Sequence, residues 1–235
     1  MMMDHLRKTD PKLYKLIQAE IQRQRETLDL IPSENIASLA MLEVIGSPLT
    51  NKYSEGYPGK RYYPGNKYCD EIELLAQKRA LQVFGLAEKE WGVNVQAYSG
   101  SPANLEIYSA LLQPGDVLLG MSLSAGGHLT HGHKVSASGK LYRSVQYNVN
   151  SSTGLIDYDE VRYLARKHKP RMIVSGLTAY PRKIDFKRFW QIAQKAGAYH
   201  LADVSHIAGL VASGLHQAPF EYADAVMTTT HKTLR

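Results

Sequence analysis

The sequence predicts an α/β domain built on a mainly parallel β-sheet. From Cys69 onward, short apolar runs alternate with stretches of helical periodicity, and this alternation is typical of parallel strands joined by crossover helices. The chain has 235 residues, of which 44% are hydrophobic and 21% charged, a composition typical of a globular protein that can bury a core. We expect residues 51–235 to form this domain and residues 1–50 to form an N-terminal helical arm.

Charge and cysteine content narrow the class of protein. There are 28 Lys and Arg against 22 Asp and Glu, a net charge of +6, but the basic residues fall in separate clusters without interleaved aromatic residues. This pattern favours small anionic ligands over nucleic acid. The single cysteine excludes an internal disulfide, and no apolar run approaches the roughly 18 residues of a membrane span. With no hydrophobic leader at its start, the chain is expected to be soluble and cytoplasmic.

The N-terminal part predicts two helices followed by a long loop. Thr9 or Asp10 can cap the first helix, and Pro11 suits its first position. A second, short helix is expected over residues 36–45. Residues 51–66 contain three glycines and two prolines among four tyrosines, which indicates a loop that is neither helix nor strand and has a functional role.

The later segments predict the alternating elements. Residues 72–83 indicate a helix that ends at Gly85, and Asp157 with Glu160 predicts a capping box at the start of another helix. Further helices are expected over residues 102–112 and 185–196. The predicted strands are residues 94–97, 116–121, 143–149, 171–175, 199–203 and 224–229.

Ligand-binding residues are expected just after these strands, because open α/β sheets bind ligands at the carboxyl ends of their strands. Ser99, Gly100 and Ser101 follow the first strand and precede a helix that begins near Pro102. Free backbone N–H groups and short hydroxyls at a helix start bind phosphate well. A simple serine cap is the alternative interpretation.

The next strand leads into a glycine-rich segment with His128, His131 and His133. No cysteine or carboxylate is interleaved with these histidines, so a metal site is not expected. We expect a histidine ring of this segment to lie flat on a ligand. His131 and His133 are interpreted as hydrogen-bonding residues of the loop.

The last two strands lead to Asp203 and Lys232. A buried carboxylate is costly unless it meets a cation, and a lysine among hydroxyls and a histidine is a candidate for imine formation. Together with the phosphate-binding helix start, these are the groups that pyridoxal phosphate requires: an acid for its ring nitrogen, an amine for its aldehyde and a helix for its phosphate. A structural ion pair between Asp203 and Lys232 is the rival interpretation.

Several segments of the chain resemble serine hydroxymethyltransferase, and the resemblance extends over nearly the whole chain from about Leu28. The segments are residues 51–63, 94–104, 126–132, 179–182, 203–210 and 228–234. The resemblance implies the large domain of a pyridoxal-phosphate enzyme of fold type I, with a seven-stranded type of sheet that is incomplete here. It also implies a transferase that interconverts serine plus tetrahydrofolate with glycine plus 5,10-methylenetetrahydrofolate.

The resemblance assigns roles to the residues that bind the cofactor. Lys232 would form the Schiff base, Asp203 would pair with the pyridine nitrogen, and His128 would stack on the ring. His206 and Thr178 would lie near the ring hydroxyl. The phosphate would be held by Ser99, Gly100 and Ser101.

Other residues would meet the substrates. Glu55 would transfer protons beside the serine hydroxyl and folate, and Tyr53 and Tyr63 would approach the cofactor and the substrate from the neighbouring subunit of a dimer or tetramer. Ser33 would touch the amino acid. The positions that match the folate site are Leu123, Gly127 and Leu129.

The chain departs from the family pattern at a few positions. Thr178 stands where serine is usual, Ser205 where a small apolar residue is common, and Pro64 where glycine is frequent. The chain also stops three residues after Lys232, whereas the small C-terminal domain of the family and the arginine for the substrate carboxylate lie further on. We therefore expect the complete protein to be active and these 235 residues alone to be inactive.

Two other classes of function remain open. A truncated chain could be a non-catalytic partner that lends Tyr53, Glu55 and Tyr63 to a full-length subunit, or it could bind RNA through its basic surfaces. Another enzyme of fold type I, such as a threonine aldolase or an aminotransferase, would share Lys232 and Asp203. The tyrosine-rich loop and the run over residues 127–129 argue against that second class.

Overall fold

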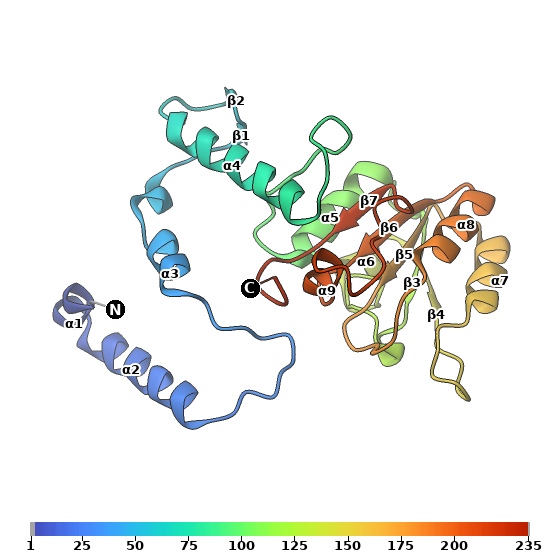
Figure 1. Ribbon diagram of the computed structural model, residues 1–235, viewed down its shortest axis with the longest axis horizontal. Helices are drawn as coiled ribbons and strands as arrows, with labels where there is room; N and C mark the ends of the chain where they lie inside the picture. Colours follow the sequence, from blue (N-terminus) through green and yellow to red (C-terminus); the bar gives the residue numbers. More distant parts are fainter. Residues whose placement is uncertain (1–2, 235) are drawn as a thin grey trace. The chain divides into compact units, whose positions relative to one another are not determined.

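The computed structural model describes residues 3–234, which divide into two compact units, one ending at Glu34 and the other beginning at Asn35. The helices of the first unit are α1 (Asp4–Thr9) and α2 (Pro11–Glu26) (Figure 1). Asp10 caps α2 by accepting a backbone N–H at 2.9 Å, and Pro11 occupies the first helical position. The predicted start of this helix is confirmed, whereas α1 is an addition to the prediction.

The second unit contains a five-stranded parallel sheet in the order β4-β3-β5-β6-β7 (Figure 1). Its strands are β3 (Val117–Met121), β4 (Arg143–Tyr147), β5 (Met172–Gly176), β6 (Tyr199–Asp203) and β7 (Ala225–Met227). Each strand overlaps a predicted one, so the α/β class with a mainly parallel sheet is confirmed. Because all five strands are parallel, their carboxyl ends share one edge of the sheet.

Helices alternate with these strands along the chain. They are α5 (Gly100–Leu111), α6 (Ala137–Leu141), α7 (Tyr158–His168), α8 (Phe186–Ala196) and α9 (Ala208–Ala212). Asp157 caps α7 with its carboxylate, as predicted, and Asp185 caps α8 in the same way. The second half of the predicted capping box is wrong: Glu160 accepts the N–H of Asn148 at 2.9 Å, and this bond ties α7 to the segment after β4.

The segment before the sheet has more regular structure than expected. Its elements are α3 (Leu39–Ile45), the 3₁₀-helix η1 (Pro48–Asn51), β1 (Gly56–Tyr57), β2 (Lys60–Arg61) and α4 (Lys67–Val83). The prediction of a strand-free loop over residues 51–66 is wrong, because β1 and β2 pair antiparallel. Gly56 and Gly59 make this hairpin possible with φ values of 94° and 72°, which are unfavourable for other residues.

The hairpin is fastened to α4 by one buried arginine. The Arg61 side chain is 5% exposed, and its guanidinium lies 2.8 Å from the carboxylate of Asp70 and 2.6 Å from that of Glu73. The same guanidinium donates to the backbone carbonyls of Ser54 and Gly56. A planar donor group with several N–H bonds is suited to this fixed arrangement, so the short strands keep their place on the helix.

The strand predicted over residues 94–97 is wrong, since this segment forms no strand in the described chain. The Asn94 side chain accepts the N–H of Gln96 at 2.8 Å. That N–H, which a sheet ladder would use, is therefore satisfied locally. Val95 is 36% exposed and belongs to neither buried hydrophobic cluster.

The hydrophobic core surrounds the central strands. All residues of β3 and β5 are buried, as expected for parallel strands covered on both faces. Phe186 and Phe189 of α8 belong to one buried cluster and Tyr108 of α5 to another. These packed elements form a rigid support for the loops at the carboxyl edge.

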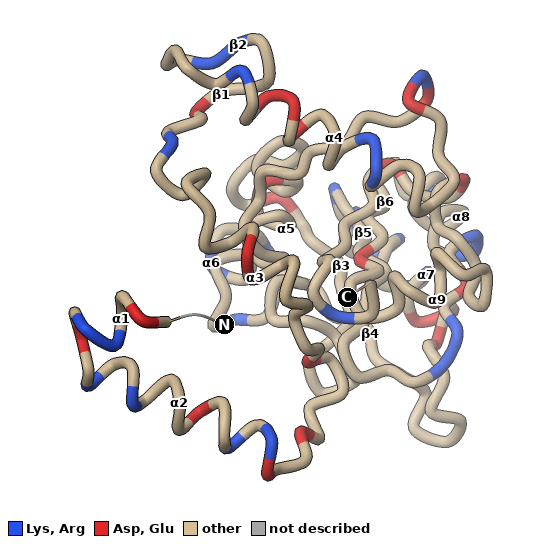
Figure 2. The backbone as a smooth tube through the Cα atoms, turned by 60° about the vertical axis from the view of Figure 1, so that its left-hand side comes forward, with Lys and Arg blue, Asp and Glu red and all other residues tan. Residues whose placement is uncertain are grey.

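Charged residues lie mainly outside this core. Figure 2 shows Lys and Arg positions that are separated by uncharged and acidic stretches along the tube. Within residues 3–234, no helix combines the length and the apolar character needed to cross a bilayer.

Candidate active site

Asp203, the last residue of β6, is the centre of a buried polar cluster; its side chain is 5% exposed. Its Oδ2 accepts hydrogen bonds from His131 Nε2 at 2.9 Å and Asn104 Nδ2 at 3.0 Å. Its Oδ1 accepts from the backbone N–H and the hydroxyl of Ser205, at 3.1 and 2.7 Å. Burial alone would raise the pKa of Asp203, but these donors, His131 foremost, hold it well below its usual range. The carboxylate is therefore an anion.

His131 is the neighbour of Asp203 that the sequence did not reveal. It is fully buried, and its Nδ1 accepts the backbone N–H of His128 at 3.2 Å. The Nε2–H of the ring therefore points at Asp203. Interpreted from the sequence as a hydrogen-bonding residue of the loop, His131 instead bonds to a partner 72 residues away; its spacing from His128 was the sole local hint.

Gly176 on the neighbouring strand β5 makes room for this pair. A Cβ at this position would lie 2.7 Å from the Cβ of Asp203 and 2.7 Å from the Cε1 of His131. Real Cβ atoms do not approach other heavy atoms so closely, since interiors are already close-packed. The glycine therefore allows the histidine ring to reach the carboxylate beside the sheet.

His128 is connected to the same cluster through Thr130. The Thr130 hydroxyl lies 2.7 Å from His128 Nδ1 and accepts a hydrogen bond from Asn104 at 2.9 Å. Burial and the charge of His131 lower the pKa of His128, which favours a neutral ring. A neutral, fixed imidazole is compatible with the stacking role expected for His128, and that role stays a prediction.

Lys232 follows β7 at the same edge of the sheet. Its Nζ donates to the hydroxyl of Thr229 at 2.9 Å, and its backbone carbonyl accepts from the Asn35 side chain at 2.8 Å. Burial lowers the pKa of the Lys232 amine, while the charge of Asp203 opposes this effect. A lowered pKa increases the fraction of unprotonated amine, the form that attacks a carbonyl carbon.

The rival interpretation, an ion pair between Asp203 and Lys232, is not what the described residues form. Within residues 3–234, the basic side chain that contacts the Asp203 carboxylate is that of His131, whose Nε2 lies 2.9 Å away. Lys232 is thus held near the carboxylate but bonded to a hydroxyl. This arrangement leaves its amine available for chemistry.

The helix start expected to bind phosphate lies against the same strand end. α5 begins at Gly100, and the Ser99 side chain forms no capping hydrogen bond in the described structure, which argues against the simple serine cap. A Cβ on Gly100 would lie 2.8 Å from Cγ2 of Thr229. The glycine therefore lets the helix start approach the segment that carries Lys232. Ser101 is exposed on the first turn.

The glycine loop after β3 is held by Thr178. Gly126 has a φ of 104°, and the Thr178 hydroxyl lies 3.0 Å from the carbonyl oxygen of Gly127, to which it donates. One task of Thr178 is therefore to fix this loop. His206 is partly buried nearby, and burial together with the charge of Lys232 lowers its pKa.

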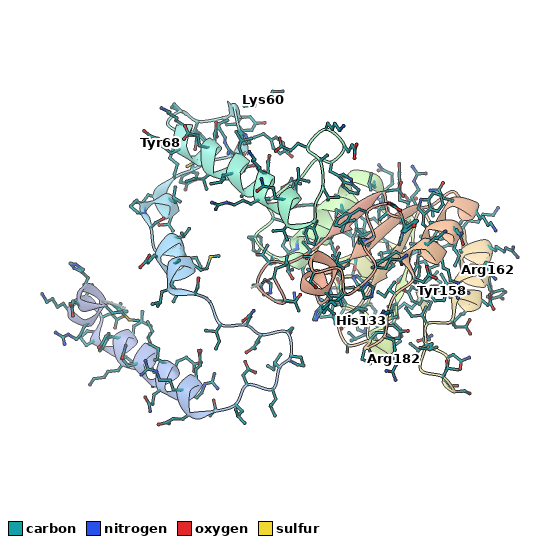
Figure 3. All side chains as sticks on the ribbon, in the orientation of Figure 1. Lys60, Tyr68, His133, Tyr158, Arg162 and Arg182 are labelled. Atoms are coloured by element: carbon teal, nitrogen blue, oxygen red, sulfur yellow. The ribbon has the colours of Figure 1, made fainter. Side chains whose placement is uncertain are left out.

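Three of the expected site residues lie away from this cluster. Tyr53, Glu55 and Tyr63 are exposed and belong to the β1–β2 segment at the outer end of α4 (Figure 1). The rings of Tyr53 and Tyr63 contact each other edge-on, with centroids 6.3 Å apart. Figure 3 shows Lys60 and Tyr68 projecting outward at the same end. Within residues 3–234, no hydrogen bond joins these three residues to Asp203 or Lys232.

The remaining expected residues are dispersed. Ser33 lies in a turn of the first unit. Leu123 and Leu129 flank the glycine loop and are 44% and 42% exposed. Their contacts with an amino acid or with folate stay predictions.

The cluster fits the chemical needs of pyridoxal phosphate. It offers a fixed anion for the ring nitrogen, an amine of lowered pKa for the aldehyde, and helix N–H groups for the phosphate. The buried Oδ1 of Asn104 has no hydrogen-bond partner within the described residues, which is uncommon for a buried polar atom. By contrast, residues 3–234 contain no group of three or more His, Cys, Asp or Glu arranged to hold a metal ion.

Comparisons with known proteins identify the family of the chain. The family model of serine hydroxymethyltransferase matches residues 6–235. Serine hydroxymethyltransferase 2 of Pseudomonas fluorescens is 57% identical over 232 residues, which cover 99% of this chain and 55% of the relative. Serine hydroxymethyltransferase of Caenorhabditis elegans is 51% identical over 239 residues, covering 100% and 47%, and the mitochondrial enzyme of Eremothecium gossypii is 48% identical over 241 residues, covering 100% and 48%. The chain spans about half the length of these curated relatives, and it belongs to the serine hydroxymethyltransferase family.

Proposed function

We propose that the protein containing this chain is a pyridoxal-phosphate-dependent serine hydroxymethyltransferase that interconverts serine plus tetrahydrofolate with glycine plus 5,10-methylenetetrahydrofolate. The observation that carries the proposal is the buried anion of Asp203, bound by four hydrogen-bond donors at the sheet edge that also bears Lys232. Family membership supports the same reaction. When bound, pyridoxal phosphate supplies the electron sink for bonds broken at the substrate α-carbon.

The residues of the cluster would hold the cofactor at four points. Lys232 would bind the aldehyde carbon through its amine. Asp203 would accept a hydrogen bond from the ring nitrogen and keep that nitrogen protonated, because its carboxylate is stabilised as an anion. His128 would lie on the ring, and His206 and Thr178 would lie near the ring hydroxyl. The phosphate would meet Ser99, Gly100 and Ser101 at the start of α5.

A second copy of the protein would complete the substrate side of the site. Tyr53, Glu55 and Tyr63 are exposed, and so are large apolar side chains before them, such as Ile36 at 84% and Leu39 at 70%. Exposed apolar surface of this kind marks interaction sites. We therefore propose a homo-oligomer with shared sites, in which Glu55 acts beside serine and folate. Ser33 would contact the amino acid, and folate would contact Leu123, Gly127 and Leu129.

The cellular location of the protein is also part of the proposal. A cytoplasmic location is our expectation for this protein, and one relative carries the word mitochondrial in its name. Fractionation of cells that express the protein with an epitope tag would distinguish the two.

Borohydride reduction tests the cofactor site directly. We expect reduction in the presence of pyridoxal phosphate to leave the cofactor on the peptide that contains Lys232. Lys232→Arg should abolish the label, whereas Lys134→Arg, at an exposed lysine outside the cluster, should keep it. Label on any other lysine would contradict the proposed role of Lys232.

The reaction is tested by serine cleavage with and without tetrahydrofolate. The chain of 235 residues should be compared with a version extended to the length of its relatives. We expect only the extended version to be active and its activity to require tetrahydrofolate. Folate-independent cleavage would indicate an aldolase instead, and activity of the 235 residues alone would refute the expectation that they are inactive.

A further inference from the structure

Ser205 is a buried polar residue that the proposed function leaves without a task. It lies two residues after Asp203 and is 4% exposed. Its hydroxyl is 2.7 Å from Asp203 Oδ1, the shortest of the four contacts that the carboxylate accepts. Hydrogen bonds to an ionised acceptor are stronger than neutral ones, so this hydroxyl is a substantial donor.

The carboxylate has no acceptor position to spare in this arrangement. An ionised carboxylate offers about four lone-pair sites, and here two donors lie on each oxygen. A ring N–H that approaches Asp203 therefore has to share or displace one of these donors. Which hydrogen bond to Asp203 is lost depends on which donor can turn away from the carboxylate most easily.

Three of the four donors are held in place. Asn104 also donates to Thr130, and the ring of His131 is fixed by the N–H that its Nδ1 accepts. The third is a backbone N–H, which cannot turn. The Ser205 hydroxyl, by contrast, rotates about a single bond, and Met227 Sδ at 3.5 Å offers it a weak alternative acceptor.

We propose that the Ser205 hydroxyl competes with the ring nitrogen of pyridoxal phosphate for Oδ1 of Asp203, and thereby sets how tightly the carboxylate holds the cofactor. This inference rests on the proposed function of the site. Ser205 acts through Asp203 and is a positioning residue. Other titratable groups interact electrostatically with Asp203, and a Ser205→Ala substitution leaves them in place. These groups are Tyr108, His128, His131, His206 and Lys232.

The dissociation constant of pyridoxal phosphate, measured by fluorescence titration of the purified protein, tests the competition. Ser205→Ala should lower this constant by about three- to tenfold, the equivalent of one modest hydrogen bond, and Ser205→Thr should restore the original value. The matched control is Ser175→Ala, which removes a buried hydroxyl with an equally short bond, 2.7 Å to His200 Nε2, on the neighbouring strand. This control should leave the constant unchanged.

A second measurement uses the cofactor-free protein. The carboxyl ¹³C resonance of Asp203, assigned with Asp203→Asn, should titrate at higher pH in Ser205→Ala than in the original protein, because a donor to the anion has been lost. Equal titration, an unchanged or weakened affinity in Ser205→Ala, or a Ser205→Thr protein that behaves like Ser205→Ala would overturn the inference alone. Failure of the original protein to bind pyridoxal phosphate would overturn the proposed function as well.

Discussion

Two regions of the second unit differ in how far they bury their side chains. Around Asp203, polar groups from separate segments are buried and bonded to one another. Residues 36–98 instead expose many of their apolar and aromatic side chains, among them Tyr53 and Tyr62 at 77% each. The first region is completed by the chain itself, whereas the second presents a surface that is suited to being covered. The expected site therefore consists of a self-contained half and a half that faces outward.

This difference has an energetic consequence. Removing one partner of a buried charge leaves the other unpaired and costs far more than removing an exposed side chain. Substitutions should thus be costly around Asp203 and nearly neutral for folding at the exposed side chains of residues 36–98. The following predictions test this contrast from its largest effect to its smallest.

His131→Leu should destabilise the fold by about 3–5 kcal/mol at pH 7, because the buried anion of Asp203 would lose its histidine partner. Urea denaturation followed by circular dichroism measures this change. The control is His133→Leu in the same loop, where the histidine is only partly buried and we expect less than about 1 kcal/mol. Equal effects of the two substitutions would mean that the buried contact between His131 and Asp203 contributes no more to the free energy of unfolding than a partly buried loop residue does.

Acid should weaken the sheet through His200. Burial lowers the pKa of His200 from 6.5 to about 4, so between these values the unfolded chain binds the proton more readily than the folded one. The stability that this group contributes is complete above about pH 6.5 and decreases by about 3 kcal/mol as the pH falls towards 4. Unfolding free energies measured at several pH values should decline less steeply in His200→Gln, and an unaltered slope would exclude His200 as the cause.

Gly100→Ala should cost about 1–3 kcal/mol, the usual range for overpacking. The new Cβ would lie 2.8 Å from the methyl of Thr229 and push the start of α5 away from the end of β7. Thr229→Ser removes that methyl and should recover part of the loss in the double variant. Gly92→Ala is the control, since nothing lies within 4 Å of a Cβ there. A neutral Gly100→Ala would show that the helix start is less tightly seated than the structure indicates.

Tyr53→Ala should change the folding free energy by less than about 0.5 kcal/mol, because this ring is already 77% exposed. If a second copy covers the segment, the same substitution should raise the dissociation constant of self-association by about tenfold, measured by analytical ultracentrifugation. Tyr163→Ala, 58% exposed on α7, should alter neither quantity. Unchanged association in Tyr53→Ala would count against the shared site.

Features with a local cause were predictable from the sequence. Strands β3, β5 and β7 are short, nearly continuous apolar runs, and the caps at Asp157 and Asp185 depend on atoms within three residues. The β1–β2 hairpin escaped prediction because two-residue strands are too short to show a period. Residues 94–97 were wrongly predicted as a strand because β-propensity does not report whether a partner strand is present.

For the candidate site, too, the features with a local cause were predictable and the contacts between distant residues were not. Asp203, Lys232 and the start of α5 could be assigned to one edge, because the ends of parallel strands meet there. The donors to Asp203 could not be assigned, since Asn104 and His131 are 99 and 72 residues away in the chain. Such contacts exist only after the sheet has formed, and no local pattern encodes them.

Gly176 shows how such a distant contact constrains the evolution of the chain. A side chain on β5 at this point would occupy the space of the imidazole beside it. The same side chain would also lie 2.7 Å from the Cβ of Asp203, so glycine is expected to be retained at position 176 even if position 131 becomes smaller. Position 176 is thus constrained by residues 27 and 45 positions away in the printed sequence, and it is not free to drift alone.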